Sequence, residues 1–314
     1  MLTRRGIRVK VMQVLYMLLQ DPAWGDKQAE QLLHNNIRQT YRAYLYVLQL
    51  LSRLSMQVDD ENDRRKSKYI PTDEDRDFNI VFFNNPCTEY LRTSETLRKE
   101  WKREGLSTTD EDELLPSIYN ELKLFPPYAA YIASTEHTIK EHRDLLRAIC
   151  KQFLPQNEAF DQFMEDMIPT WSDDEQVVLA KVDETLRKLP PESFKEQELY
   201  QAEVGVEERD FAKTLLMKCL EDQGRFDQMI EAKLKNWELD RVSLLDRILM
   251  KMALTEFLHI PTIPLKVTIN EYLEISKLYS TPKSREFING ILDNLMIELK
   301  KEGSIVKTGR GLIE

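Results

Sequence analysis

The feature that most constrains the fold of this chain is the helical spacing of apolar residues in its long segments. Residues 264–293 are predicted to form a helix, a sharp break and a second helix. In the second helix and its continuation, apolar residues recur with a period of 3.6 residues, which indicates one buried face. These residues are Phe287, Ile288, Ile291, Leu292, Leu295 and Met296. Segments 4–20 and 27–57 show the same period, so the sequence predicts an all-α fold.

Gly290 lies within this apolar pattern. Glycine inside a helix costs about 1 kcal/mol relative to alanine. We therefore expect another backbone or a ligand to approach closely there. On that interpretation, Gly290→Leu would overpack the C-terminal helix pair.

Composition restricts the classes of function. The 314 residues suffice for one or two domains. Only 9 glycines occur, and neither GxGxxG nor GxxxxGK[ST] is found, which argues against Rossmann and P-loop enzymes. The net charge of −10 argues against a chain that is basic throughout but leaves room for a local basic patch. We expect no enzyme activity, because no catalytic constellation is visible.

The cysteines and the hydropathy indicate the cellular compartment of the protein. Cys87, Cys150 and Cys219 are too far apart for a metal motif, and their odd number does not suit a disulfide framework. We expect free thiols in a reducing cytoplasm and neither a metal nor another cofactor. No apolar run approaches the length of a membrane span, so no membrane association is expected.

The N-terminal helix, residues 4–20, begins with Arg4, Arg5, Arg8 and Lys10, and no acidic residue occurs before Asp21. Cations at a helix N-terminus oppose the macrodipole, so helix stability does not explain them. Two interpretations remain open. The segment is either a solvated tail or an arm that binds phosphates, since arginine matches phosphate geometry.

Three stretches carry a resemblance to a known family. PLKVTINEYLEISKLY followed by FINGILD resembles the signature of the NusB family of bacterial transcription antitermination factors. The matching residues there are Lys266, Val267, Ile269, Asn270, Glu271, Lys277, Phe287, Asn289, Gly290, Leu292 and Asp293. The N-terminus is similar at Arg4, Arg5, Arg8, Gln13, Leu15 and Tyr16, although Gly6 replaces a frequent arginine. A third stretch is similar at Asp246, Arg247, Leu249, Ala253 and Glu256.

The resemblance implies an RNA-binding antitermination factor. Members of the family bind the boxA element of ribosomal RNA leaders with the ribosomal protein NusE, and they act on RNA polymerase in an antitermination complex. The residues implied to bind RNA are Arg4, Arg5, Arg8, Lys283, Phe287 and Asn289. Lys283 stands where the family often has an acidic residue, which should either favour phosphate binding or mark a shifted RNA path. Phe287 either stacks on a base or belongs to the core, and Asn289 either reads a base edge or caps a backbone group.

For NusE, the resemblance implies contacts at Tyr16 and Asp246. An exposed tyrosine beside a carboxylate would suit a basic ribosomal protein. Both could equally be ordinary surface residues.

The resemblance also implies a NusB-like helical bundle of two packed subdomains. We expect N-terminal helices of this fold over residues 1–57, a helical insertion over 58–205 and a C-terminal helical domain over 206–302. Within the insertion, residues 58–77 are expected to form a charged linker, and residues 303–314 a mobile tail.

Two other functions compete with RNA binding. A helical adaptor whose insertion supplies the binding surface would have no affinity for boxA RNA. NusB-like domains also occur fused to ribosomal RNA methyltransferases, but such an enzyme needs a glycine-rich cofactor domain that this chain lacks.

Overall fold

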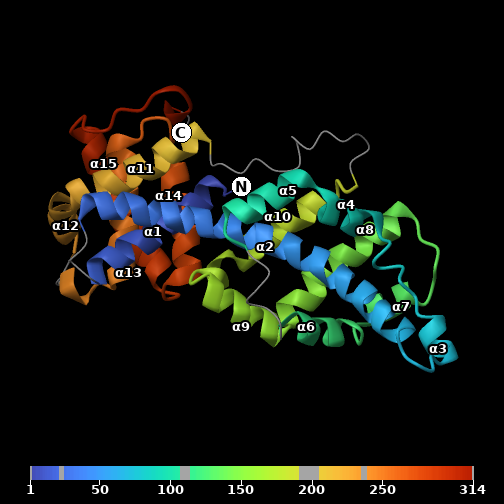
Figure 1. The fold of residues 1–314 in the computed structure, drawn as a ribbon. Coiled ribbons are helices and arrows are strands. Elements are labelled where there is room, and N and C mark those ends of the chain that lie inside the picture. The colour runs from blue at the N-terminus through green and yellow to red at the C-terminus, as the bar shows by residue number, and fades with distance from the viewer. Residues whose placement is uncertain (1, 21–24, 107–113, 191–204, 235–238, 313–314) are drawn as a thin grey trace. The chain divides into compact units, whose positions relative to one another are not determined.

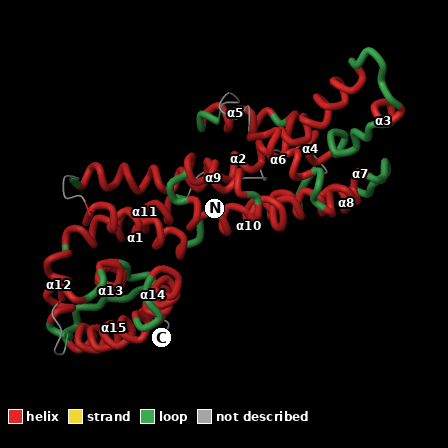
Figure 2. Tube along the Cα trace, turned by 90° about the horizontal axis from the view of Figure 1, so that it is seen from below, coloured by secondary structure: helices red, strands yellow, loops and turns green. Residues whose placement is uncertain are grey.

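The computed structural model describes residues 2–20, 25–106, 114–190, 205–234 and 239–312. Within these ranges every regular element is a helix and no strand occurs (Figure 2). The predicted all-α fold is confirmed.

The chain divides into two compact units. The first comprises Arg38–Ala202, and the second combines Leu2–Ile37 with Glu203–Glu314. Each unit has its own hydrophobic core, and the two cores share no residue. Helix α2, Asp26–Lys66, contributes its first turns to the second unit and the rest to the first.

Helix α2 corrects the sequence prediction of a charged linker at residues 58–77. Residues 58–66 continue this helix, and a four-residue helix, α3, follows at Asp73–Arg76. The basic residues Arg64, Arg65 and Lys66 occupy the last turn of α2, where cations interact favourably with the helix macrodipole. Their positive charge therefore stabilises the C-terminal turn of the helix.

The second unit is built around α13 (Figure 1). Its helices are α1 (Arg4–Gln20), α11 (Val206–Glu221), α12 (Gln223–Glu231), α13 (Leu244–His259), α14 (Leu265–Tyr279) and α15 (Ser284–Lys301). Residues on every side of α13 are buried, which is typical of a helix at the centre of a core. Helices α1, α11, α14 and α15 each pack against it. Residues far apart in the sequence thus form one core.

The apolar stripe of α15 faces this core, as its period predicts. Ile288, Ile291, Leu292 and Leu295 are buried. Phe287 and Met296, at the edges of the stripe, are partly buried against the same core.

Gly290 contradicts the sequence interpretation. Its backbone is exposed, and a Cβ atom added there would meet no heavy atom within 4 Å. Neither a neighbouring backbone nor close packing accounts for this glycine, so the expected overpacking by leucine has no structural basis.

The first unit contains most of the remaining helices. These are α4 (Pro86–Thr93), α5 (Glu95–Arg103), α6 (Leu114–Leu122), α7 (Pro126–Ile132), α8 (Ile139–Ala148), a π-helical turn η1 (Ile149–Phe153), a 3₁₀ turn η2 (Leu154–Gln156), α9 (Glu158–Met167) and α10 (Trp171–Leu186). Large aromatic side chains, including Trp171 and Tyr128, fill its core. Helix α8 packs against α4, α7 and α10.

The segment after α15 was expected to be mobile, but residues 303–312 are held against the second unit. The Lys307 ammonium donates to the backbone oxygens of Glu256 and Ile260 at 2.8 and 2.9 Å. The Thr308 amide donates to the Pro261 oxygen at 3.0 Å. Two further 3₁₀ turns, η4 (Leu239–Arg241) and η5 (Gly309–Leu312), complete the described elements.

Candidate nucleic-acid interface

A buried ion pair anchors α1 to the rest of the second unit. Arg8 is 2% exposed and Glu256 of α13 is 0% exposed. The guanidinium donates from Nε and Nη2 to both carboxylate oxygens, at 2.6 and 2.9 Å. Glu256 also accepts hydrogen bonds from the hydroxyls of Thr268 and Tyr272 of α14, at 3.0 and 2.7 Å. Four side chains from three helices therefore satisfy one another away from water.

The electrostatics of this cluster keep Arg8 charged. Burial acts to lower the pKa of Arg8, but the hydrogen bonds and the charge of Glu256 raise it above its ordinary value. Burial, reinforced by the charge of Glu256, raises the pKa of Tyr272, so this phenol stays protonated and donates. Arg8 was predicted from the sequence to contact RNA phosphate. Its burial on Glu256 instead makes it the residue that positions the start of α1.

Arg4 and Arg5 lie on the exposed side of the same helical turn. Arg5 donates from Nε and Nη2 to Glu271 of α14, at 2.9 and 2.8 Å, while nearly half of its side chain stays exposed. The hydrogen bonds from Arg5 lower the pKa of Glu271. Arg4 is similarly exposed and lies 3.8 Å from a carboxylate oxygen of the exposed Glu207. These two arginines remain accessible to an anion.

Helices α1 and α15 both pack against α14. The pKa of Glu274, on α14, is lowered chiefly by a hydrogen bond from Lys277 and also by the charges of Arg5 and Arg285. Cations from the starts of α1 and α15 thus act on one carboxylate of α14. Lys283 is exposed at this end, and no side chain caps the N-terminus of α15. Arg285, which is also exposed, was not singled out from the sequence, although it lies two positions before Phe287.

The two remaining residues of this predicted RNA site lie one turn further along α15. Phe287 is partly buried against the core, so the structure gives it a packing role and leaves part of the ring accessible. Asn289 is also partly exposed, and its side-chain amide donates to Asp293 at 3.0 Å. Gly290 leaves the backbone beside Asn289 uncovered.

The two predicted partner residues have different environments. Tyr16 is 43% exposed on α1, next to the exposed Met17, which sequence reasoning did not single out. Asp246, by contrast, is buried in the first turn of α13. Its two oxygens accept hydrogen bonds from the hydroxyls of Ser280 and Ser284, at 2.6 and 2.8 Å. Asp246 therefore fixes the junction between α14 and α15 and does not form an exposed anchor beside Tyr16.

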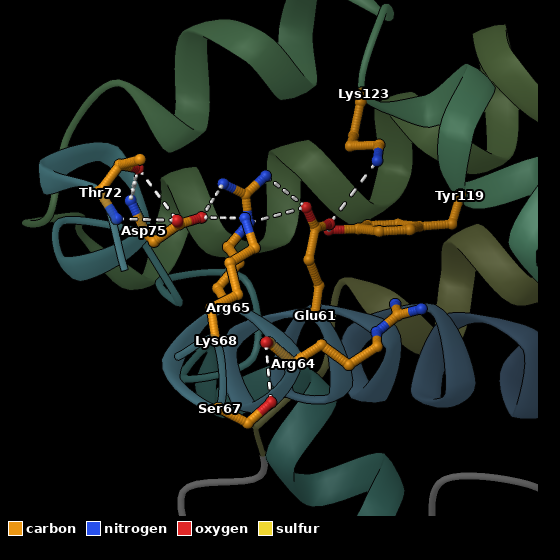
Figure 3. Close-up of polar contacts among 9 residues, drawn as sticks. All are labelled: Glu61, Arg64, Arg65, Ser67, Lys68, Thr72, Asp75, Tyr119 and Lys123. Atoms are coloured by element: carbon orange, nitrogen blue, oxygen red, sulfur yellow. Dashed lines mark hydrogen bonds and ion pairs between the residues drawn. The ribbon is translucent and has the colours of Figure 1, made fainter. Parts of the chain in front are cut away.

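In the first unit, two residues of the basic run at and just after the end of α2, Arg65 and Lys68, form ion pairs (Figure 3). Arg65 contacts Glu61 and Asp75 at 2.5 and 3.4 Å, and Lys68 contacts Asp75 at 2.7 Å. The Tyr119 hydroxyl donates to Glu61 at 2.9 Å. The hydrogen bond from Lys68 lowers the pKa of Asp75 to about 2. This network joins α2, α3 and α6, so its charged side chains have a structural role.

The described residues also bear on metal binding, thiol chemistry and membrane insertion. No group of three or more His, Cys, Asp or Glu side chains in these ranges is arranged to hold a metal ion. Cys87, Cys150 and Cys219 are buried free thiols, and burial raises the pKa of each of them. None of the described helices is both long and apolar enough to cross a membrane.

These observations define a class of protein: an all-α protein whose candidate site is a surface of exposed cations and amides at helix ends, braced by buried polar clusters. Comparison with known proteins identifies the family. The model of the NusB family matches residues 175–296. The NusB transcription antitermination protein of Salinibacter ruber is 44% identical over 105 residues, which are 33% of this chain and 66% of that protein. The chain belongs to the NusB family.

Other relatives show how much of the family the match covers. NusB of Chloroherpeton thalassium is 36% identical over 134 residues, covering 43% of this chain and 60% of that protein. NusB of Bacillus cereus is 38% identical over 91 residues, covering 29% and 70%. The match thus spans slightly less than two thirds of the first two relatives. A T. maritima NusB structure aligns with 50% of this chain and 91% of its own at 27% identity, with a TM-score of 0.30.

Proposed function

We propose that this protein is an RNA-binding transcription antitermination factor. It binds the boxA element of ribosomal RNA leaders together with the ribosomal protein NusE, as part of an antitermination complex with RNA polymerase in the cytoplasm. Membership of the NusB family, whose matched relatives are transcription antitermination proteins, supports this proposal. So does the cluster of exposed cations on the second unit of a chain with net charge −10.

The observation that carries the proposal is the set of exposed cations at the starts of α1 and α15, two helices that both pack against α14. Arg4 and Arg5 belong to the first turn of α1, and Lys283 and Arg285 flank the first residue of α15. Helix N-termini offer unpaired N–H groups and a positive dipole end, so they bind phosphates. Cations there add attraction for an anion while opposing the helix dipole. A bound polyanion neutralises these cations and so offsets their unfavourable interaction with the helix dipole.

The remaining predicted residues fit the same ligand. The accessible part of Phe287 stacks on an unpaired base, and the Asn289 amide binds a base edge, which are usual ways of reading single-stranded RNA. Arg8 acts as a positioning residue, because it holds the turn that carries Arg4 and Arg5. Asp246 does the same for the start of α15.

The test is RNA binding by the Arg4→Ala/Arg5→Ala/Lys283→Ala variant, measured by fluorescence anisotropy at several salt concentrations. Each lost phosphate contact on a single strand lowers the slope of log K against log salt by about 0.7, so the slope should flatten by about 2. Lys66→Ala/Lys99→Ala/Lys102→Ala changes the charge equally at exposed sites of the first unit and serves as the control. Circular dichroism verifies folding.

Two outcomes would count against the proposal. Equal affinity of the wild type for boxA RNA and for a scrambled sequence would contradict the proposed specificity for boxA. No affinity for either RNA would favour a helical adaptor.

For NusE, we propose a contact through Tyr16 and its exposed neighbour Met17. Truncating an exposed aromatic anchor typically costs more than 1 kcal/mol of binding free energy when it lies in the interface centre. Tyr16→Ala should therefore weaken NusE binding at least several-fold in calorimetry while leaving boxA RNA binding by the free protein intact. Unchanged NusE affinity would place the partner surface elsewhere.

A further inference from the structure

The first unit carries a basic surface that the NusB match leaves without a function. Residues 143–151 of α8 and η1, and residues 181–188 in and just after the last turns of α10, contain six basic side chains and three acidic ones. We name this set the α8–α10 patch. Its cations are Arg143, Arg147, Lys151, Lys181, Arg187 and Lys188, and its acids are Asp144, Asp183 and Glu184.

Three of these cations converge on one carboxylate. Asp183, whose side chain is nearly buried, lies 2.6 Å from Arg147 Nε, 3.0 Å from Lys151 Nζ and 2.8 Å from Arg187 Nη2. Burial opposes ionisation of Asp183, but hydrogen bonds from all three cations lower its pKa overall. Asp144 also pairs with Arg147 at 3.1 Å, and Glu184 pairs with Lys181 and, at 3.2 Å, with Lys188. Three carboxylates neutralise only three of the six cationic charges. The patch therefore has an excess of positive charge on an otherwise acidic chain.

Structural stability accounts for only part of this arrangement. Arg147 is the most buried of the three cations and joins α8 to α10 through Asp183, which is a structural role. Lys151 and Arg187 are about half exposed, and Lys188 beside them is equally exposed. Exposed ion pairs contribute at most about 1 kcal/mol, and crowding like charges offsets that gain. Lys151 also lies in a π-helical turn, a rare element that is frequent at functional sites.

We propose that the α8–α10 patch binds the phosphate backbone of RNA, as a second contact outside the boxA site. Arginine forks and lysine ammonium groups are the usual partners of phosphate oxygens. Because the patch is made of cations rather than aromatic side chains, its contacts are independent of base sequence. This inference rests on the proposed function for its choice of RNA as the polyanion.

The test uses the full chain and two RNAs, a short boxA RNA and a uridine homopolymer. In the Lys151→Ala/Arg187→Ala/Lys188→Ala variant, homopolymer affinity should fall and the slope of log K against log salt should flatten by about 2. Binding of the short boxA RNA should be unchanged. The exposed Lys66→Ala/Lys99→Ala/Lys102→Ala variant is the matched control for charge. Arg147 is left in place, so the contact between α8 and α10 persists.

The outcomes separate this inference from the proposed function. If the patch variant keeps the wild-type homopolymer slope, the inference is overturned even where boxA RNA binds. If the wild type does not bind boxA RNA, the proposed function fails, while the homopolymer still decides the role of the patch. Vesicles of phosphatidylserine and phosphatidylcholine form a third arm. Vesicle binding that the patch variant loses, with homopolymer binding unaffected, would assign the patch to anionic lipid instead and overturn RNA binding there.

Discussion

At the scale of single residues, burial separates side chains that look alike in the sequence. Arg4, Arg5 and Arg8 are equivalent in composition, yet Arg8 is enclosed with Glu256 while the other two are accessible. Removing one partner of a buried ion pair leaves an uncompensated charge, which costs far more than removing an exposed pair. The stabilising ion pair and the proposed RNA contacts therefore lie on different faces of one helix.

Arg8→Ala should lower the free energy of unfolding by about 3–5 kcal/mol, because Glu256 would remain buried without its cation. Denaturant titration measures this change. Arg4→Ala is the control and should shift stability by no more than about 0.5 kcal/mol. Similar small effects of both substitutions would show that water reaches Glu256.

Gly290→Ala should stabilise the protein by up to about 1 kcal/mol, because the exposed helical site has room for a methyl group and alanine is the better helix former. A thermal melt measures the effect. A lower melting temperature would restore the close-packing interpretation of this glycine. Weaker boxA binding by the more stable variant would show that RNA needs the uncovered backbone.

Lys307 should make stability depend on pH. Partial burial lowers its pKa to about 8, whereas an unfolded lysine titrates near about 10.4. Between these values the unfolded chain binds more protons than the folded one, so the stability of the wild type relative to Lys307→Met should rise with pH. Denaturant titrations of both proteins below and above pH 8 test this. A pH-independent difference would contradict it.

At the scale of helices, Asp246 connects the ends of three elements. It lies in α13 and accepts hydrogen bonds from Ser280, which follows α14, and Ser284, which begins α15. A buried residue of α13 thus holds the break between α14 and α15. This fixes the backbone from which Lys283 and Arg285 project.

Asp246→Ala should cost about 1–3 kcal/mol, because it leaves the buried hydroxyl of Ser284 without its acceptor. It should also weaken boxA RNA binding, although Asp246 itself is not accessible. Denaturant titration and anisotropy measure the two effects. Ser243→Ala, which removes the N-cap of the same helix, is the control for stability alone. Equal RNA affinity of both variants would show that RNA binding does not depend on the hydrogen bonds from Ser280 and Ser284 to Asp246.

Local pattern predicted the helices better than it predicted the roles of their polar residues. The stripe of α15 follows from spacing within one segment, so it was visible in the sequence. Arg8 and Glu256 lie 248 positions apart, and Asp246 lies 38 positions from Ser284, so their pairing depends on the tertiary fold. Helix α2 extends to Lys66, beyond the predicted end at residue 57, because the basic residues of its last turn interact favourably with the helix macrodipole.

At the scale of the whole molecule, the two separate cores predict two separate stabilities. Leu146 belongs to the core of the first unit and Leu216 to that of the second, and both are fully buried. Since neither core contributes residues to the other, we expect denaturant unfolding in two transitions.

Leu146→Ala and Leu216→Ala should each cost about 2–5 kcal/mol and should each shift a different transition. Circular dichroism followed along a denaturant gradient measures the shifts. A single transition, moved equally by both substitutions, would show that α2, which belongs to both units, couples them into one cooperative structure.

The division of the second unit into Leu2–Ile37 and Glu203–Glu314 has a consequence for synthesis. A ribosome makes α1 first and α13 only after the entire first unit. At translation rates of about 5–20 residues per second, α1 waits on the order of ten seconds or longer for its partners. During that time its apolar stripe, including Ile7, Val11 and Val14, has no core to enter. The nascent chain thus leaves this stripe without its native partners until Glu256 has been translated.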